Sequence, residues 1–310
     1  MTPPFYACVD VGGTKVAVTL ADSQSPKNLQ LYGHRSEPTI KEGEPHALAE
    51  QIIRMVDAAC NELEIAPMLI TRIGVSSCGP FVKHGEMLAL SSPNICGGLA
   101  GSDRRLPNTW TTVPIQAPLE KRFTFVRIQN DAVSALEAER RWGALQGYNH
   151  CAYVTWSTGV GVGLCVDGRV LHGKNGNAGH AGHMFVSNNT TALCGCGNLG
   201  DVESLVSGNA LKSRFGLDAN ALLSSTQSQA TVDEVCRNMS RMLYNLIITL
   251  DLQRISLGGS VFWHHQTLLL PKLRAQILGK LPALTDDCTL VPAGLGLQVG
   301  NLAALALVAH

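Results

Sequence analysis

Asp10-Val11-Gly12-Gly13-Thr14-Lys15 is the stretch that decides the fold of this chain. It lies between two apolar, β-branched runs, residues 5–9 and 16–20, which predict two strands joined by a tight turn. The tip is unusual for a hairpin, because a carboxylate precedes the glycines and a hydroxyl and an ammonium group follow them. Backbone amides beside such groups suit a phosphate tail, and Asp10 suits a hydrated Mg²⁺. The alternative is a plain β-turn, and Gly-Gly-Thr alone does not decide between the two.

Length and charge narrow the class of protein. A chain of 310 residues is long enough for two domains. Lys and Arg together number 24, as do Asp and Glu, so no net field attracts nucleic acid or an anionic membrane, and a small-molecule substrate is expected. Met1-Thr2-Pro3-Pro4 has no basic region followed by an apolar stretch, and no apolar run approaches the ~20 residues that span a bilayer. We therefore expect a cytoplasmic protein, with most of its ten cysteines reduced and buried.

The pattern of strand, glycine turn and strand occurs again in the middle of the chain. Residues 151–156 and 164–166 are apolar, and Ser157-Thr158-Gly159-Val160-Gly161-Val162-Gly163 between them is a turn of small residues. Each pattern opens a run of alternating strands and helices, which predicts a duplicated α/β fold whose glycine turns face each other across a cleft. Coincidence between two ordinary hairpins is the alternative.

Apolar spacing gives a coarse map of the remaining elements. It predicts helices over residues 46–63, 132–142, 202–214, 232–250, 268–278 and 299–308. Shorter apolar runs predict strands near residues 29–34, 70–76, 123–129 and 255–260, the last of which runs into the glycine turn Gly258-Gly259-Ser260.

Asn130-Asp131 stands where a predicted strand meets a predicted helix. A carboxylate at such a junction is held in place and can accept the proton of an attacking hydroxyl. Helix capping is the alternative explanation for this pair.

Read in order, these motifs resemble the ROK family of sugar kinases and repressors (repressor, open reading frame, kinase), within the actin–hexokinase superfamily. The match runs nearly end to end, with landmarks at Asp10 to Lys15, Gly79-Pro80, Pro93-Asn94, Asn130-Asp131-Ala132, Thr158 to Gly163, Gly176 to His183, Cys194 to Glu203 and Gly258-Gly259-Ser260. The resemblance implies a duplicated, ribonuclease-H-like two-domain α/β fold of the actin or hexokinase type. It implies a smaller N-terminal domain of residues 1–118 plus 299–310 and a larger C-terminal domain of residues 119–298, which would hold the catalytic Asp, the second phosphate loop and a zinc motif.

The resemblance also implies ATP and Mg²⁺ as cofactors and assigns roles to residues. The nucleotide and its metal would be bound by Asp10, Gly12, Gly13, Thr14, Lys15, Thr158, Gly159, Gly161, Gly258 and Gly259. The acceptor would be bound by Gly79, Asn94, Asn130, Asp131, His180, His183 and Glu203, with Asp131 as general base. Phosphoryl transfer depends mainly on positioning and charge stabilisation, which two amide-lined loops and Mg²⁺ can supply.

His180 departs from the family pattern, which has a glutamate that binds ring hydroxyls at this position. Glutamate is an anionic acceptor, whereas neutral histidine offers one donor and one acceptor. We therefore expect an altered acceptor choice, away from glucose or N-acetylmannosamine. The alternative is that His180 simply replaces one hydrogen-bond acceptor with another.

The zinc motif departs from the family pattern C-x-C-G-x-x-G-C-x-E at its third cysteine. His183, Cys194 and Cys196 match the family's ligands, Asp201 stands where the third cysteine would be, and Glu203 matches the final glutamate. Thiolate, imidazole and carboxylate all bind Zn²⁺, so a four-ligand structural site is expected, with lower affinity than three thiolates would give. His180 is an outside candidate for the fourth ligand, and loss of the metal is the alternative.

The leading hypothesis is a phosphotransferase that transfers the γ-phosphoryl group of ATP to a hydroxyl, expected to be the primary 6-hydroxyl, of a hexose or hexose-like ring. The runner-up is a kinase for an amino sugar or cyclitol in secondary metabolism. A sugar-responsive repressor of the same family would need a DNA-binding segment ahead of Asp10, and no basic surplus supports one. A non-catalytic sugar-binding protein would not need Asp131 and two phosphate loops. The resemblance further implies a homodimer or homotetramer, with no nucleic-acid or membrane partner.

Overall fold

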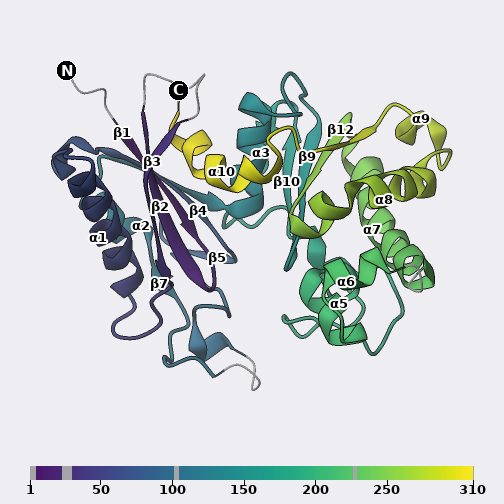
Figure 1. Cartoon of the computed structure of the whole chain (residues 1–310), viewed down its shortest axis with the longest axis horizontal. Coiled ribbons are helices and arrows are strands. Elements are labelled where there is room, and N and C mark those ends of the chain that lie inside the picture. Colours follow the sequence, from purple (N-terminus) through teal and green to yellow (C-terminus); the bar gives the residue numbers. More distant parts are fainter. Residues whose placement is uncertain (1–4, 23–29, 101–104, 226–228, 310) are drawn as a thin grey trace. The chain divides into compact units, whose positions relative to one another are not determined.

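The computed structural model describes residues 5–22, 30–100, 105–225 and 229–309 (Figure 1). The chain divides into two units, of which the first comprises Met1–Ala138, His172–Ala178 and Gly300–His310, and the second comprises Glu139–Leu171 and Gly179–Val299. Met1 to Pro4, which entered the expectation of a cytoplasmic location, lie outside the described residues. Within those residues, we find no helix with the length and apolar character needed to cross a membrane.

The first unit is built on a five-stranded mixed sheet in the order β3-β2-β1-β4-β8. Its strands are β1 (Phe5–Val11), β2 (Lys15–Asp22), β3 (Leu31–Pro38), β4 (Arg72–Ser77) and β8 (Phe125–Asn130). The hairpin of β1 and β2 is antiparallel, whereas β1, β4 and β8 run parallel to one another. A second, antiparallel sheet joins β5 (Phe81–His84), β6 (Met87–Leu90) and β7 (Val113–Pro114).

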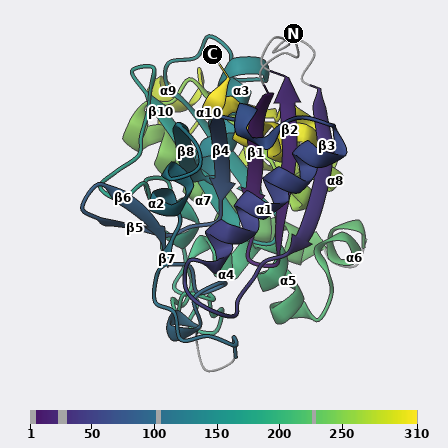
Figure 2. The same cartoon turned by 90° about the vertical axis from the view of Figure 1, so that its left-hand side faces the viewer.

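Helices cover both faces of the first sheet, as Figures 1 and 2 show. The helix α1 (Ala47–Glu62) packs against β2 and β3, because Leu48, Ile52, Met55, Val56 and Ala59 form a buried stripe at helical spacing. The helix α10 (Val299–Val308) lies on the opposite face. It approaches β4 so closely that a Cβ atom on Gly74 would lie 2.2 Å from the carbonyl oxygen of Ala304. The shorter helices of this unit are η1 (Pro67–Leu69), η2 (Gly97–Leu99) and α2 (Gln116–Glu120).

The second unit has a five-stranded sheet in the order β11-β10-β9-β12-β13. Its strands are β9 (Cys151–Trp156), β10 (Val160–Val166), β11 (Arg169–Val170), β12 (Arg254–Gly258) and β13 (Thr289–Pro292). Long helices α7 (Gln229–Leu250) and α8 (Ser260–Ile277) pack together beside this sheet (Figure 1). The remaining helices are η3 (Ala181–His183), α4 (Val202–Val206), α5 (Gly208–Phe215), α6 (Ala219–Ser224), α9 (Pro282–Thr285) and η5 (Gly296–Gln298).

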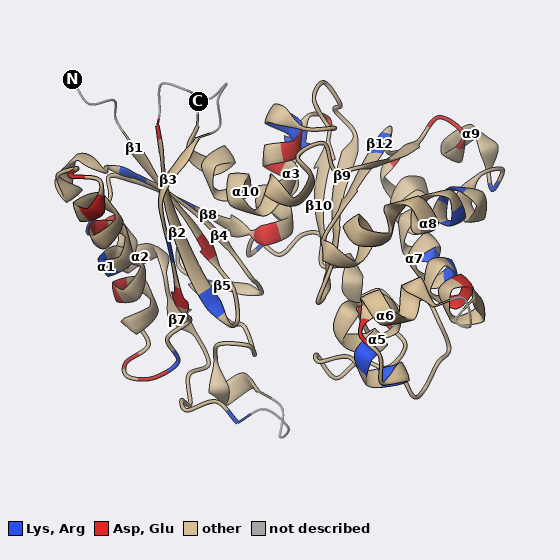
Figure 3. Cartoon of the chain, viewed as in Figure 1, with Lys and Arg blue, Asp and Glu red and all other residues tan. Residues whose placement is uncertain are grey.

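The two sheets share one topology, which confirms the predicted duplicated α/β fold. In each, the first strand forms an antiparallel hairpin on one side and a parallel pair on the other: β1 with β2 and β4, and β9 with β10 and β12. A further parallel strand, β8 or β13, follows in each case. Acidic and basic residues both occur in each of the two units (Figure 3).

The division into units differs from the boundary expected at residues 118 and 119. Asn130 belongs to the first unit because β8 pairs with β4 along its whole length. The helix α3 (Asp131–Trp142) then crosses the division, which falls between Ala138 and Glu139. Asp131 is therefore anchored to the first sheet rather than the second.

Three predicted elements have different limits in the structure. The predicted helix over residues 202–214 is two helices, because Ser207 adopts an extended conformation and its hydroxyl caps α5 by accepting the amide of Ala210. The helix predicted over residues 268–278 is preceded by a helical segment that begins at Ser260, and the two are separated by a kink at His265, whose φ is −123° and ψ is 18°. The third strand runs from Leu31 to Pro38, and Leu29, where it was predicted to begin, lies outside the described residues.

Candidate functional site

The carboxyl ends of the three parallel strands in the first unit bring the predicted catalytic residues together. Asp10 on β1 is the register partner of Ser76 on β4, and Ser77 on β4 is the partner of Asn130 on β8. Asp131 follows directly as the first residue of α3. Parallel strands end at one edge of a sheet, so the sequence-predicted Asp10, Asn130 and Asp131 share that edge.

Asp10 and Asp131 interact electrostatically. Burial and the negative charge of Asp131 raise the pKa of the Asp10 carboxyl to about 6, against the lowering effects of Lys15 and a hydrogen bond with Ser76. Two carboxylates that disfavour each other's ionisation form a site that a divalent cation would stabilise. The donor set at this edge therefore fits the Mg²⁺ expected from the sequence.

Asp131 is exposed at the start of α3, whereas Asn130 is buried. The amide of Ala132 donates to Asn130 Oδ1 at 3.0 Å and to Asp131 Oδ1 at 2.8 Å. One oxygen of each side chain thus accepts an amide at the start of α3, as helix capping would predict. A carboxylate has two oxygens, so capping by one is compatible with proton acceptance by the group.

The first glycine turn is held by bonds within itself and to Thr39. The amide of Gly12 donates to the carbonyl of Lys15 at 2.9 Å. The Thr39 hydroxyl donates to the carbonyl of Gly12 at 2.7 Å, and its amide donates to the carbonyl of Thr14 at 3.0 Å. Thr39 is a support that sequence reasoning missed, because no local pattern links it to a turn so far back in the chain.

Two further predicted acceptor residues belong to the first unit. A Cβ atom on Gly13 would lie 2.8 Å from Cβ of Asn94, so the absence of a side chain lets Asn94 pack against the turn. Gly79 precedes Pro80 through a cis peptide bond. The preceding Cys78 donates its amide to the carbonyl of Val11 at 2.9 Å, which attaches this segment to the end of β1.

The second glycine turn, in the second unit, is fastened by the start of α5 and by Glu203. The amides of Gly208 and Asn209 donate to the carbonyls of Ser157 and Thr158 at 2.8 and 3.2 Å. Glu203 Oε2 accepts the amide of Val160 at 2.9 Å. Sequence reasoning expected Glu203 to bind the acceptor and did not anticipate this bond to the turn.

Gly258 and Gly259 lie beside the same turn. Gly258 is the register partner of Thr155, next to the end of β9. Gly259 has a φ of 86°, and a Cβ atom there would lie 2.4 Å from the carbonyl oxygen of Trp156. This close approach requires glycine. Gly161 is paired with Thr155 on the other side of β9, so the predicted nucleotide-binding positions of the second unit form one group.

The predicted zinc ligands come together in the second unit. One ligand atom from each of His183, Cys194, Cys196 and Asp201 lies within 4.8 Å of all the others. His183 Nδ1 is 3.2 Å from Asp201 Oδ2 and 3.4 Å from Cys196 Sγ, and Cys194 Sγ is 3.7 Å from His183 Nδ1. Tetrahedral Zn²⁺ with ordinary bond lengths separates its ligand atoms by about 3.3–3.8 Å. The cluster fits the metal with Asp201 as an oxygen ligand.

Asp201 serves the cluster and the fold at once. It is completely buried and caps α4 by accepting the amide of Ser204 on Oδ1 at 2.8 Å, while Oδ2 faces His183. Burial alone would raise the pKa of this carboxyl, but hydrogen bonds from His183 and the Ser204 amide bring it to about 2. The carboxylate is therefore ionised, as a metal ligand must be.

His180 lies at the start of η3, close to the metal cluster but outside it. Its ring stacks on that of His183, with centroids 6.2 Å apart and an interplanar angle of 25°. Asp201, rather than His180, is therefore the candidate for the fourth ligand.

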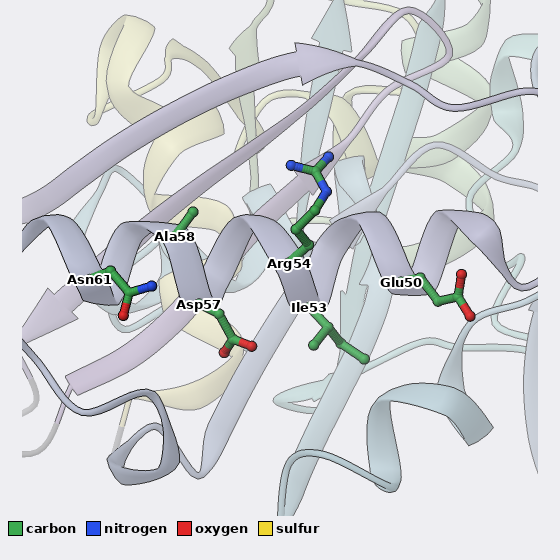
Figure 4. A pocket seen from close by; sticks show the side chains of 6 residues that line it. All are labelled: Glu50, Ile53, Arg54, Asp57, Ala58 and Asn61. Carbon is green, nitrogen blue, oxygen red and sulfur yellow. The ribbon is translucent and has the colours of Figure 1, made fainter.

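A surface hollow along α1 is unrelated to these groups (Figure 4). Its lining comes from one side of that helix, Glu50, Ile53, Arg54, Asp57, Ala58 and Asn61, and includes none of the predicted site residues.

Comparison with known proteins shows the family to which this chain belongs. The profile of the ROK family matches residues 6–310. The chain belongs to the ROK family. It is 31% identical over 264 residues to an N-acetylmannosamine kinase of Salmonella arizonae, a match that covers 82% of each protein. The structure superposes on a ROK hexokinase from Thermus thermophilus with a TM-score of 0.71 and 28% identity, over 98% of this chain and 97% of that one.

A second solved structure supports the fold alone. The ROK family glucokinase from Streptomyces griseus, in complex with glucose and AMPPNP, has a TM-score of 0.71 at 22% identity and is covered over 97% of both chains. This actin- and hexokinase-type two-domain architecture is the one that the sequence resemblance predicts.

Proposed function

We propose that this ROK protein is an ATP-dependent sugar kinase, a phosphotransferase with an alcohol group as acceptor. The observation that carries the proposal is the pair of carboxylates, Asp10 and Asp131, at the edge of the first sheet next to a glycine turn with Lys15. The names of the relatives, N-acetylmannosamine kinase and hexokinase, support the same class of reaction.

In this proposal, Asp131 acts as the general base. Its carboxylate takes the proton of the acceptor hydroxyl, the hydroxyl oxygen forms a bond to the γ-phosphorus, and the bond from that phosphorus to the leaving oxygen of ADP breaks. Mg²⁺ held near Asp10 would neutralise charge on the transferred phosphoryl group. The backbone of Gly12 to Lys15 binds phosphate oxygens, Thr158, Gly159 and Gly161 form the second phosphate loop, and Gly258 and Gly259 lie under the adenosine.

The proposed acceptor is the primary 6-hydroxyl of a hexose or hexose-like ring, bound by Gly79, Asn94, Asn130, His180, His183 and Glu203. The expectation that His180 turns the enzyme away from N-acetylmannosamine stays a prediction. The relatives named as kinases of that sugar favour the runner-up, an amino-sugar acceptor. N-acetylmannosamine is therefore the first acceptor to test.

We further propose that Zn²⁺ binds to His183, Cys194, Cys196 and Asp201 as a structural ion. It would hold His183 and the start of α4 in place. We also expect a homodimer or homotetramer, which light scattering on the purified protein tests.

A substrate panel tests the proposed function. The native protein and His180→Glu are incubated with ATP, Mg²⁺ and N-acetylmannosamine, N-acetylglucosamine, glucose, mannose or a cyclitol, and the position of the new phosphate is read by phosphorus NMR. We expect phosphorylation at the 6-hydroxyl of one ring and a changed preference in His180→Glu. No ADP formation above the acceptor-free rate with any ring would contradict the kinase proposal.

A further inference from the structure

The segment His172–Ala178 belongs to the first unit, although the chain on both sides of it belongs to the second. Before it, the amide of Leu171 donates to the carbonyl of Leu164 on β10 at 2.9 Å. After it, the carbonyl of Gly179 accepts the amide of Val162, also on β10, at 3.2 Å. The residues between these two bonds belong to the first unit, so we call His172–Ala178 the strap.

Asn177 fastens the strap to β5 through two hydrogen bonds. The amide of Phe81 donates to Asn177 Oδ1 at 2.8 Å, and Asn177 Nδ2 donates to the carbonyl of Phe81 at 2.7 Å. The side-chain amide thus pairs with the main chain as a neighbouring strand would. Of the side chains of this size, only an amide offers a donor and an acceptor in that arrangement.

Other contacts hold the rest of the strap in the same place. The amide of Ala178 donates to the carbonyl of His172 at 3.1 Å, which closes the strap into a compact loop. Burial lowers the pKa of His172, as do the charges of Arg127 and Lys83, whereas the charge of Glu137 raises it. We call the two hydrogen bonds between Asn177 and Phe81 the clamp. The clamp is part of a closed loop rather than an isolated contact.

The two residues of the clamp, Phe81 and Asn177, are each close in sequence to a segment that is predicted to bind the acceptor. Phe81 directly follows the cis Gly79-Pro80 bond, and Asn177 closely precedes His180 in the chain. Phe81 is only 1% exposed and pairs with Leu90 on β6, so it is a rigid anchor. The bonds to this anchor fix the end of the strap, at which the His180 segment begins.

We propose that Asn177 is a positioning residue for the acceptor, because its two bonds to Phe81 fix the end of the strap, from which the chain continues directly into the His180 segment. The expected effect on the KM for the acceptor rests on the proposed function, because it requires the protein to be a kinase. Without the clamp, the strap keeps its loop-closing bond but loses its link to β5. The acceptor then has to order the His180 segment when it binds, and its affinity falls.

Asn177→Ala tests the clamp, with Asn175→Ala as the matched control. Asn175 lies in the same strap and makes no hydrogen bond to another described residue, so its replacement removes a similar amide from the loop without touching the clamp. We expect the KM for the acceptor to rise on the order of ten-fold in Asn177→Ala, the size of effect that loss of two such bonds produces. The kcat value and the KM for ATP should change by less than about two-fold, as should every constant of Asn175→Ala.

Hydrogen exchange of the Phe81 amide separates failure of this inference from failure of the proposed function. In Asn177→Ala this amide should exchange faster than in the native protein, whether or not the protein is a kinase, while exchange in β1 and β4 stays unchanged and shows that the variant is folded. Faster exchange with an unchanged acceptor KM would overturn the positioning role and leave the kinase intact. Unchanged exchange would overturn the clamp itself.

Discussion

The two glycine hairpins occupy equivalent places in equivalent sheets but carry different chemistry. Asp10 stands immediately before Val11, the last paired residue of β1, and Thr155 holds the same position before Trp156 on β9. The first hairpin thus has a carboxylate where the second has a hydroxyl. A carboxylate reaches the second hairpin from α4, where Glu203 accepts the amide of Val160.

This difference shows that the two halves of a duplicated fold carry different functional groups. The first sheet presents acids at its strand ends, which suits metal binding and proton transfer. The second sheet presents close-packed glycines and holds the His, Cys and Asp cluster in the connection before α4. The comparison therefore predicts unequal effects for substitutions at matching positions.

Asp10→Asn and Thr155→Val give the largest contrast. We expect Asp10→Asn to lower kcat on the order of 100-fold or more, because it removes the charge that holds Mg²⁺. Thr155→Val should change kcat by only about three-fold or less, because no charge is lost. Steady-state kinetics with the acceptor found in the panel measures both, and similar losses in the two variants would break the proposed division.

Asp201→Asn tests the metal cluster of the second half. Asparagine caps α4 as well as aspartate does, but it lacks the anionic oxygen, so the affinity for Zn²⁺ should fall about ten-fold or more. Competition with a chelator, followed by metal analysis, measures the change. The native protein should hold close to one zinc per chain, and fewer than half a zinc per chain in protein purified without chelator would contradict the site.

The raised pKa of Asp10 predicts a stability cost at neutral pH. Its folded pKa of about 6 lies above the ordinary 3.8, so the stabilising effect of the bound proton is complete below pH 3.8 and disappears as the pH rises through 6. Metal-free Asp10→Asn should therefore be more stable than the native protein at pH 7 by about 1–2 kcal/mol, after allowance for partial exposure of the site. Urea unfolding with a chelator present should show this advantage at pH 7 and its loss near pH 3.8; an advantage independent of pH would refute the assigned cause.

The cap on α4 gives the smallest expected effect. In the absence of metal, Asp201→Ala should be less stable than Asp201→Asn by about 1 kcal/mol, because alanine cannot accept the amide of Ser204. Urea unfolding of the two metal-free variants measures the difference. Equal stabilities would mean that Asp201 serves the metal alone.

Local patterns predicted the two glycine hairpins and the helix α1, because each depends on spacing within a short stretch of sequence. The metal cluster was expected from the resemblance to the ROK family pattern. The duplicated fold followed from the repetition of the strand, glycine turn and strand pattern. The shared edge of Asp10 and Asp131 was not predicted, because the expected domain limit assigned Asp131 to the second half. The sequence did not predict the bonds from Thr39 to the first turn, from Glu203 to Val160 or from Asn177 to Phe81. These join residues far apart in the chain, and their partners are main-chain groups, which every residue carries.

The division into units differs from the expected domain limit for a related reason. Residues 90–118 are rich in turn-forming residues, but the composition of a loop does not say which sheet the next strand joins. The parallel pairing of β8 with β4 is a non-local contact, and it assigns Asp131 to the first unit.

Asp131→Asn tests the central claim most directly, with turnover and acceptor binding measured on the same preparation. The side chain keeps its size and its ability to cap α3 but can no longer take a proton. We predict that kcat falls on the order of 100- to 10,000-fold, while calorimetry shows acceptor affinity within a few-fold of the native value. Turnover close to the native rate would contradict the account, because the acid at the edge of the first sheet would then not be the base.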